Sequence, residues 1–332
     1  MKNSTVLLSI CIPTYDRVNY LIENLDVLIP QIESAKYGVE LIISDNGTPE
    51  KQYDELKNYV ENQRIAIKLY HHHENIGGRA NFVYAVSKAN GTYVFLLGDD
   101  DILSPNLLEI LFPFIGSQQY SLIHFNFLRA DATLQHGGLN TSKYDGVVQK
   151  SSPGDFLRNT DYDPTFMSSI VFLKECWDTG ITRVRDIYYG YEWYGAICWG
   201  LLLKKLPCLF YYFPLCIQRN PPRIWSKDTP IFKYIGQCAL FKDLDTLEPG
   251  LYESKYNFLK TKYYEKFFID LTLDQSYYQG FEDGFKYALP SAFYKKVHSC
   301  LHSPLYIFIP IFYTLEIKAK LIIYGFRKLF GR

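Results

Sequence analysis

The stretch YVFLLGDDDIL, Tyr93–Leu103, is an apolar run that leads directly into three consecutive carboxylates. Burying like charges side by side is costly unless a cation neutralises them. Carboxylate oxygens at the end of a strand suit Mg²⁺ or Mn²⁺ carrying a polyphosphate. The triplet Asp99–Asp101 therefore indicates a site for metal and nucleotide together. An acidic turn facing solvent is the alternative, because Asp is a common turn residue.

Strand and helix patterns alternate up to this triplet. Buried strands are predicted for the apolar runs Val6–Ile12, Val39–Ser44, Ile65–Tyr70 and Tyr93–Leu97. Helices are predicted between them, in Val18–Ile32, from about Pro49 onward, and in Ala80–Asn90. Such alternation with short loops predicts an α/β fold, with a mostly parallel sheet, helices on both faces and right-handed crossovers.

Polar residues follow each predicted strand, at Thr14–Arg17, Asp45–Asn46, Glu74–Asn75 and Asp99–Asp101. Ligands of open parallel sheets collect beyond the carboxyl ends of the strands. We therefore expect these four strand ends to meet at one crevice. Gly77–Gly78 forms neither a G-x-G-x-x-G fingerprint nor a P-loop, which removes the sequence support for a dehydrogenase or a P-loop enzyme.

The composition narrows the class of protein. The chain has 332 residues, 48% of them hydrophobic, which is enough for a large domain with an appendage or for two domains. Basic and acidic residues number 35 each, so a general attraction to nucleic acid is absent. The seven cysteines include no CxxC pair and are expected to be buried thiols in a reducing cytoplasm. The amino terminus lacks the cleavage region of a secretory signal, which also favours the cytoplasm.

Four motifs stand in a fixed order along the first third of the chain: Pro13–Arg17, Ile43–Gly47, Asn75–Asn81 and Gly98–Asp101. Together they resemble the ordered motifs of family 2 glycosyltransferases with the GT-A fold. Within that family the chain is similar to bacterial O-antigen sugar transferases of the abequosyltransferase-like group. The resemblance implies a GT-A domain at 1–215. The residue pattern after it, with long helical stretches rich in Tyr, Phe and Lys, predicts a C-terminal helical region with a basic amphipathic tail at 216–332.

The resemblance also implies roles for single residues. The nucleotide pocket would be shaped by Pro13, Thr14, Tyr15 and Arg17. Asp45 would accept a hydrogen bond from the base, although a strand-end turn would use Asp as well. The ribose and diphosphate would lie beside Asn75, Gly77 and Arg79. A tight turn and a solvated helix start are the alternatives for these last residues.

The metal ligands follow less directly, because Gly98 takes the place of the first Asp in the family's Asp-x-Asp motif. The resemblance then leaves Asp100 as the main ligand of Mn²⁺ or Mg²⁺, with Asp99 or Asp101 assisting. A shifted ligand set and a site that depends less on metal are both open. The run His71–His73 is not expected to bind one ion, since adjacent side chains of an extended segment point to opposite faces.

A general base is needed to remove the proton of the acceptor hydroxyl. Glu192 is the first candidate, in an aromatic setting that would stack on a sugar and raise its proton affinity, and Asp186 is the second. The alternative for Glu192 is a helix start stabilised by the helix dipole. The segment Gln218–Trp225 combines a strand end with Arg219 and Arg223. It resembles the mobile basic loop that family members close over the diphosphate, or else it is a Pro-rich linker.

Residues 303–332 combine an apolar run with Lys and Arg, and are too short in apolar length to span a bilayer comfortably. They are expected to lie on an anionic membrane face, or to dock on the catalytic domain or a second subunit.

The leading hypothesis is an inverting, metal-assisted glycosyltransferase that acts on an undecaprenyl-diphosphate-linked oligosaccharide in O-antigen or capsule assembly. It would be peripheral on the inner face of the cytoplasmic membrane, and a homo-oligomer is open. The alternatives are a nucleotidyltransferase and a non-catalytic scaffold with a degenerate site. A nucleotidyltransferase would be expected to have a Gly-rich loop after the first strand, where this chain has Pro13–Tyr15.

Overall fold

The computed structural model describes residues 6–135, 138–139, 148–160, 166–188, 191–220 and 229–257, and some positions between 283 and 295. The chain forms two compact units, of which the first comprises Met1–Arg185 and Glu192–Ile224. The second comprises Asp186–Tyr191 and Trp225–Arg332. Arg223 and the predicted membrane-binding tail, 303–332, lie outside the described residues.

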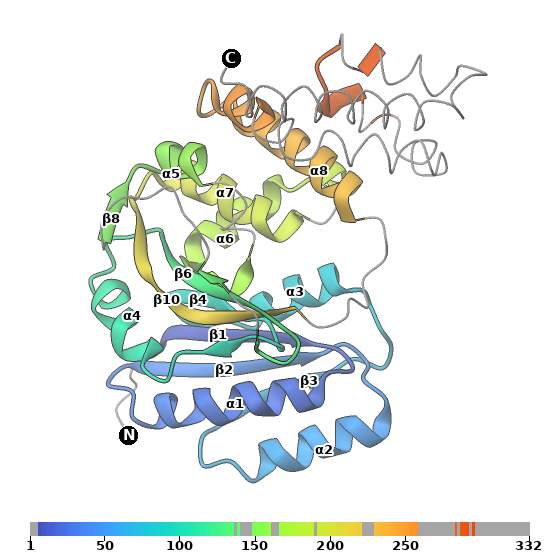
Figure 1. The fold of residues 1–332 in the computed structure, drawn as a ribbon, viewed down its shortest axis with the longest axis vertical. Helices are drawn as coiled ribbons and strands as arrows, with labels where there is room; N and C mark the ends of the chain where they lie inside the picture. The colour runs from blue at the N-terminus through green and yellow to red at the C-terminus, as the bar shows by residue number, and fades with distance from the viewer. Residues whose placement is uncertain are drawn as a thin grey trace, which may run out of the picture. The chain divides into compact units, whose positions relative to one another are not determined.

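The amino-terminal half of the first unit has the predicted alternation of strands and helices (Figure 1). Its elements are β1 (Val6–Thr14), α1 (Val18–Glu33), β2 (Gly38–Asp45), α2 (Glu50–Glu61), β3 (Ile67–His71), α3 (Gly78–Ser87) and β4 (Tyr93–Leu96). The four strands run parallel in the order β3-β2-β1-β4. The predicted α/β fold is therefore confirmed for this half. Helix α3 begins two residues earlier than predicted, because Gly77 already adopts a non-helical cap conformation.

The same sheet continues with mixed strand directions, so that it has ten strands in all among the described residues. The further elements are β5 (Ile102–Leu103), α4 (Leu107–Gly116), β6 (Leu122–Asp131), β7 (Gly138–Leu139), β8 (Val148–Ser151), α5 (Pro153–Asn159), β9 (Ile170–Leu173), α6 (Lys174–Gly180), α7 (Glu192–Lys204) and β10 (Cys208–Asn220). Strand β9 is antiparallel to both β4 and β6, whereas β6 and β10 are parallel. This mixed part was not predicted.

The core lies between the sheet and its helices. Figure 1 shows α1 and α2 on one side of the sheet and α3, α6 and α7 on the other. Strand β4 is buried at all four residues, and β1 is buried at all but its first. Strands covered on both faces need apolar side chains in both directions, which explains the continuous apolar runs of the sequence. In α1 the buried face includes Leu21, Leu25 and Leu28, the face that the periodicity predicts.

Helices α6 and α7 approach each other closely through two glycines. A Cβ on Gly200 would lie 2.0 Å from the carbonyl oxygen of Cys176, and one on Gly180 would lie 1.8 Å from that of Ala196. Any other residue would force the helices apart. This packing fixes the axis of α7 and with it the position of Glu192 at its first turn.

The second unit contains α8 (Thr229–Leu244) and the short 3₁₀ turn Asp186–Tyr188, which packs on it. The hydroxyl of Tyr188 donates to Asp243 at 2.8 Å. In the described parts of the chain, no helix combines the length and apolar character that a bilayer crossing needs. Six of the seven cysteines are described; all six are buried thiols, as predicted, and Cys300 lies outside the described residues.

Candidate active site

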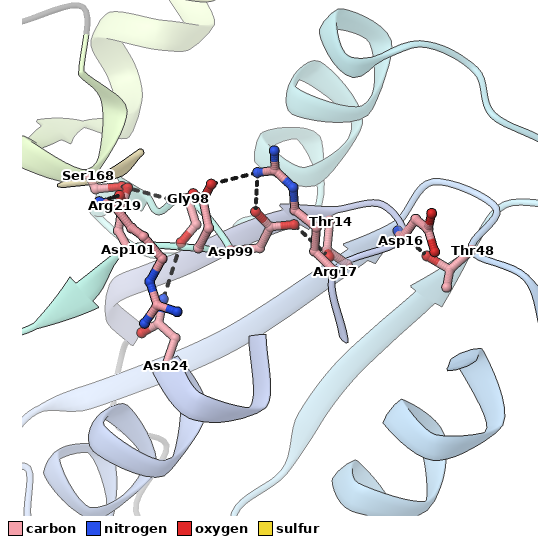
Figure 2. A network of polar contacts seen from close by, with 11 residues as sticks. Thr14, Asp16, Arg17, Asn24, Thr48, Gly98, Asp99, Asp101, Ser168 and Arg219 are labelled. Carbon is pink, nitrogen blue, oxygen red and sulfur yellow. Dashed lines mark hydrogen bonds and ion pairs between the residues drawn. The ribbon is translucent and has the colours of Figure 1, made fainter. Parts of the chain in front are cut away.

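Two of the three aspartates after β4, Asp99 and Asp100, contact the end of β1 and the turn beyond it, and Figure 2 shows Asp99 beside Thr14 and Arg17. Asp99 accepts a hydrogen bond from the hydroxyl of Thr14 at 2.8 Å. One guanidinium nitrogen of Arg17, Nη1, lies 2.6 Å from Oδ2 of Asp100 and 3.4 Å from Oδ1 of Asp99. The ends of β1 and β4 therefore meet at one positively charged atom.

A strained turn brings Arg17 to this place. Asp16 has a φ of +53°, a left-handed conformation that is uncommon for a residue with a side chain. Its backbone N–H donates to the hydroxyl of Thr48 at 2.9 Å, and its carboxylate accepts from Gln52 at 2.6 Å. These two contacts hold the turn, after which Arg17 precedes α1 and points back toward the aspartates (Figure 2).

The third aspartate, Asp101, faces a different set of partners. It accepts hydrogen bonds from the hydroxyl of Ser168 and, at 3.2 Å, from the backbone N–H of Arg219. Ser168 also accepts from the backbone N–H of Gly98 at 2.8 Å. Both carboxylate oxygens of Asp101 thus already have a protein donor, in the interior of the sheet.

This arrangement explains the glycine in the place of the family's first Asp. A Cβ on Gly98 would lie 2.7 Å from Oδ2 of Asp101 and 3.1 Å from the hydroxyl of Ser168. A side chain at Gly98 would therefore disrupt the pair that holds Asp101. Position 98 therefore carries no carboxylate, because Asp101 and Ser168 occupy the space that its side chain would need.

The electrostatics of the triplet are unfavourable for three free carboxylates. Burial, and then the charge of Asp100, raises the pKa of Asp99 to about 6, although Arg17 and Thr14 oppose the rise. Burial also raises the pKa of Asp100, and burial together with the charge of Asp100 raises the pKa of Asp101 well above its usual range. A cation placed between Asp99 and Asp100 would relieve this cost.

The geometry fits a divalent metal that is bound by two of the three aspartates, Asp99 and Asp100. Oxygens of Asp99 and Asp100 already converge on the cationic Nη1 of Arg17. Among the described residues, no cluster of three or more His, Cys, Asp or Glu side chains could hold a metal. Two protein carboxylates, with phosphate oxygens and water completing the shell, is a common arrangement for Mg²⁺. The oxygens of Asp101 are occupied, so it is the poorest ligand of the three.

Arg219 is the second-last residue of β10, so it lies at the strand end of the segment Gln218–Trp225 and not in a loop. The residue is buried, at 6% exposure. Its Nη2 donates to Glu23 at 2.8 Å, and its guanidinium carbon lies 4.6 Å from the ring centroid of Tyr20. Its Nε has no hydrogen-bond partner among the described residues.

The ends of β2 and β3 supply the other side of the site. The backbone N–H of Asn46 donates to the carbonyl of Thr14 at 2.9 Å, which joins the ends of β1 and β2. The side-chain amide of Asn46 donates to Asn75 at 2.9 Å, and its carbonyl accepts from the N–H of Ile76 at 2.9 Å. Asn75 in turn accepts from the N–H of Gly77 at 2.9 Å. The predicted convergence of four strand ends is confirmed.

Asp45 is fully buried at the end of β2. Its Oδ2 accepts from the backbone N–H of Thr48 at 3.1 Å and lies 2.6 Å from Nδ1 of His71. Its Oδ1 has no hydrogen-bond partner among the described residues. Of the other predicted pocket residues, Pro13 is buried in β1 beside β2, and Tyr15 is 38% exposed.

The two candidate bases lie in different units. Glu192 is the first residue of α7, and its Oε1 accepts from Arg79 of α3 at 3.0 Å. Its Oε2 is buried without a hydrogen-bond partner in the described part of the chain. Two predicted site residues therefore meet across the helices α3 and α7. Asp186 belongs to the second unit, so its role stays a prediction.

Adjacent residues of the histidine run contact different partners, as expected for an extended segment. His71 faces Asp45, whereas Nε2 of His72 lies 3.4 Å from the hydroxyl of Ser44 and its ring meets the edge of Tyr84. Sequence reasoning gave no role to His71, Thr48 or Ser168. Ser168 is 67 residues from Asp101, and no local pattern marks it.

The fold and the acidic strand ends define an α/β protein of the GT-A type. Residues 9–168 match the model of the family described as "Glycosyl transferase family 2". The chain thus carries a family 2 glycosyltransferase domain and is a glycosyltransferase. The family match gives no support to a nucleotidyltransferase.

Curated relatives agree with this family, and solved structures share the fold. The abequosyltransferase RfbV of Salmonella typhimurium is 29% identical over 233 residues, which are 65% of this chain and 67% of the relative. A crystal structure of residues 1–349 of TarS from S. aureus has a TM-score of 0.67 at 13% identity, covering 95% of this chain and 92% of that one. The mannosyltransferase PcManGT of Pyrobaculum calidifontis, solved with GDP-Man and Mn²⁺, has a TM-score of 0.50 at 14% identity, covering 98% and 87%. At these identities the structures show the fold alone.

Proposed function

We propose that this glycosyltransferase transfers a sugar from a nucleotide-diphosphate sugar to a hydroxyl of a lipid-linked oligosaccharide, with inversion at the anomeric carbon. The observation that carries the donor side is the convergence of Asp99 and Asp100 on one cationic atom at the joined ends of β1 and β4. The family match supports a nucleotide-sugar donor. In the structure of TarS with UDP-GlcNAc, a protein of the same fold binds such a donor.

The donor would lie along the strand ends. Its base would meet Asp45, whose Oδ1 accepts no hydrogen bond from the residues that the structure describes. Its ribose and diphosphate would lie beside the turn at Asn75 and Gly77, where Gly77 has a φ of +89° and open space where a Cβ would be. Arg17, Arg79 and Arg219 would supply positive charge toward the phosphates, as could Arg223.

Asp100 and Asp99 would hold the Mn²⁺ or Mg²⁺ that the family resemblance implies. When bound, the metal would neutralise the charge that develops on the leaving diphosphate. Arg17 already neutralises the same two carboxylates, so its guanidinium would turn from them toward the phosphates once the donor is present. The guanidinium of Arg17 would thereby stay in the site.

The acceptor side would depend on Glu192. In an inverting displacement the acceptor oxygen forms the new bond to the anomeric carbon while the bond to the diphosphate breaks. The hydroxyl proton passes to a carboxylate within hydrogen-bond reach. Oε2 of Glu192 is buried and accepts no hydrogen bond within the described part of the chain, and Arg79 holds Oε1 at 3.0 Å.

The acceptor class is supported by the relative and by the resemblance. RfbV is named an abequosyltransferase, and the resemblance points to O-antigen or capsule assembly. A lipid-linked acceptor on undecaprenyl diphosphate would place the enzyme on the inner face of the cytoplasmic membrane, where the basic tail 303–332 would bind anionic lipid. The GT-A boundary near residue 215 and a homo-oligomer belong to the same proposal.

Calorimetry with UDP-, GDP-, dTDP- and CDP-sugars, with and without Mn²⁺, tests the donor site. One nucleotide class should bind in a metal-dependent way, and Asp100→Asn should abolish this binding. Asp178→Asn is the matched control, because Asp178 is exposed and its carboxylate pairs with Lys174 at 2.6 Å. The absence of binding to the whole panel would overturn the proposal.

Turnover tests the base. Glu192→Gln should lower the transfer rate by about 10²–10⁴-fold, the usual contribution of a general base, while donor binding persists. Transfer at the wild-type rate by this variant would move the role to another carboxylate, with Asp186 next in line.

A further inference from the structure

His71 and Asp45 are held side by side by the sheet itself. They are partners in the parallel register of β2 and β3, and each is the last residue of its strand. The backbone N–H of His72 donates to the carbonyl of Asp45 at 3.0 Å, which fixes the two strand ends together. The contact between the side chains is therefore built into rigid backbone.

The carboxylate of Asp45 is anchored through one oxygen only. Oδ2 receives two donors, the N–H of Thr48 at 3.1 Å and Nδ1 of His71 at 2.6 Å. Two donors on one oxygen fix the rotation of the carboxylate, and hence the direction of the other oxygen. Oδ1 is buried and has no hydrogen-bond partner among the described residues. Leaving a buried acceptor without a donor is unfavourable, so such an atom is a natural place for a ligand N–H.

The imidazole is itself oriented by packing. Its ring stacks on Tyr53 of α2 with centroids 3.8 Å apart and planes 25° apart. A carboxylate oxygen only accepts, so Nδ1 must carry the proton in this contact. The ring cannot rotate about this contact without losing the stack, and the tautomer is set by Asp45.

We propose that His71 is a positioning residue for recognition of the nucleotide base: it holds Oδ2 of Asp45 so that Oδ1 accepts the N–H of the base. This inference rests on the proposed function, because it concerns the base of the nucleotide-sugar donor. Uracil, thymine, guanine and cytosine each present an N–H donor, so His71 sets the direction of the acceptor and not the choice among these bases by itself.

Three variants separate the hydrogen bond from the ring. His71→Phe keeps a ring for the stack on Tyr53 and removes the donor. His71→Asn keeps an amide N–H near the position of Nδ1 and removes the ring. If His71→Phe does not fold, His71→Leu removes both the donor and the ring, and its comparison with His71→Asn isolates the hydrogen bond.

Calorimetry with the nucleoside diphosphate that the wild type binds, in the presence of Mn²⁺, gives the readout. His71→Phe should raise Kd about ten-fold, the loss expected for one hydrogen bond to a charged group. His71→Asn should stay within about three-fold of the wild type on the same reasoning. Inorganic pyrophosphate with Mn²⁺ should compete equally in all variants, because it has no base; a merely structural role would weaken both ligands together.

The outcomes distinguish the two proposals. If the wild type binds none of UDP, GDP, dTDP and CDP, the proposed function fails and this inference falls with it. If the wild type binds one of them and His71→Phe binds it equally well, only the role of His71 is overturned. Parallel weakening of pyrophosphate would also overturn it.

Discussion

Replacing Asp99 by Asn should stabilise the ligand-free protein at neutral pH. The carboxyl of Asp99 is 6% exposed and has its pKa raised to about 6 from a usual 3.8. Burial and the neighbouring Asp100 are the main causes. Between these two pH values the folded protein holds a proton that the unfolded chain has lost, so stability falls as pH rises through this window.

The size of the effect follows from the pKa. One pKa unit corresponds to about 1.4 kcal/mol, so the rise to about 6 makes ionised Asp99 cost at most about 3 kcal/mol above pH 6. Asn cannot ionise, but it receives the hydrogen bonds of Thr14 and Arg17 less well than a carboxylate does. We therefore expect Asp99→Asn to gain about 1–3 kcal/mol at pH 8 and almost nothing at pH 4.

Urea unfolding of both proteins from pH 4 to pH 8, without metal or nucleotide, measures this difference. Asp178→Asn, on an exposed carboxylate, should show a small difference that does not follow the same curve. A destabilised Asp99→Asn at pH 8, or a gain that is the same at all pH values, would refute the argument. Mn²⁺ with nucleotide should stabilise the wild type far more than the variant, since ligands stabilise the state that binds them.

Two further predictions concern the pair that holds Asp101. Gly98→Asp, which restores the family's Asp-x-Asp pattern, should lower stability by about 1–3 kcal/mol and leave Mn²⁺ affinity no better, because its Cβ would lie 2.7 Å from Asp101. Thermal unfolding and Mn²⁺ titration test this, and tighter Mn²⁺ binding would contradict it. Ser168→Ala removes a donor from buried Asp101 and should cost about 1–3 kcal/mol in urea unfolding, whereas Ser117→Ala, on an exposed contact, should cost far less. Equal losses in the two serine variants would contradict the role of Ser168.

Periodicity predicted the amino-terminal half of the fold well because each of its helices and strands has a recognisable pattern in its own residues. Strands β1 and β4 are buried on both faces and read as continuous apolar runs, and α1 presents its leucines at helical spacing. Short crossovers then leave only a parallel arrangement for neighbouring strands. The mixed half could not be predicted in this way, because an apolar run such as β9 carries no information about which strand it pairs with or in which direction.

The sequence by itself determined that acidic and amide side chains gather at the carboxyl ends of parallel strands, since that follows from strand order and chain direction alone. Only the tertiary structure decided how those groups divide their tasks. Asp101 faces Ser168 and Arg219, 67 and 118 residues away, and Glu192 meets Arg79 across 113 residues. Such contacts depend on the packing of distant elements, and three identical carboxylates in a row give no local signal of which one faces the interior.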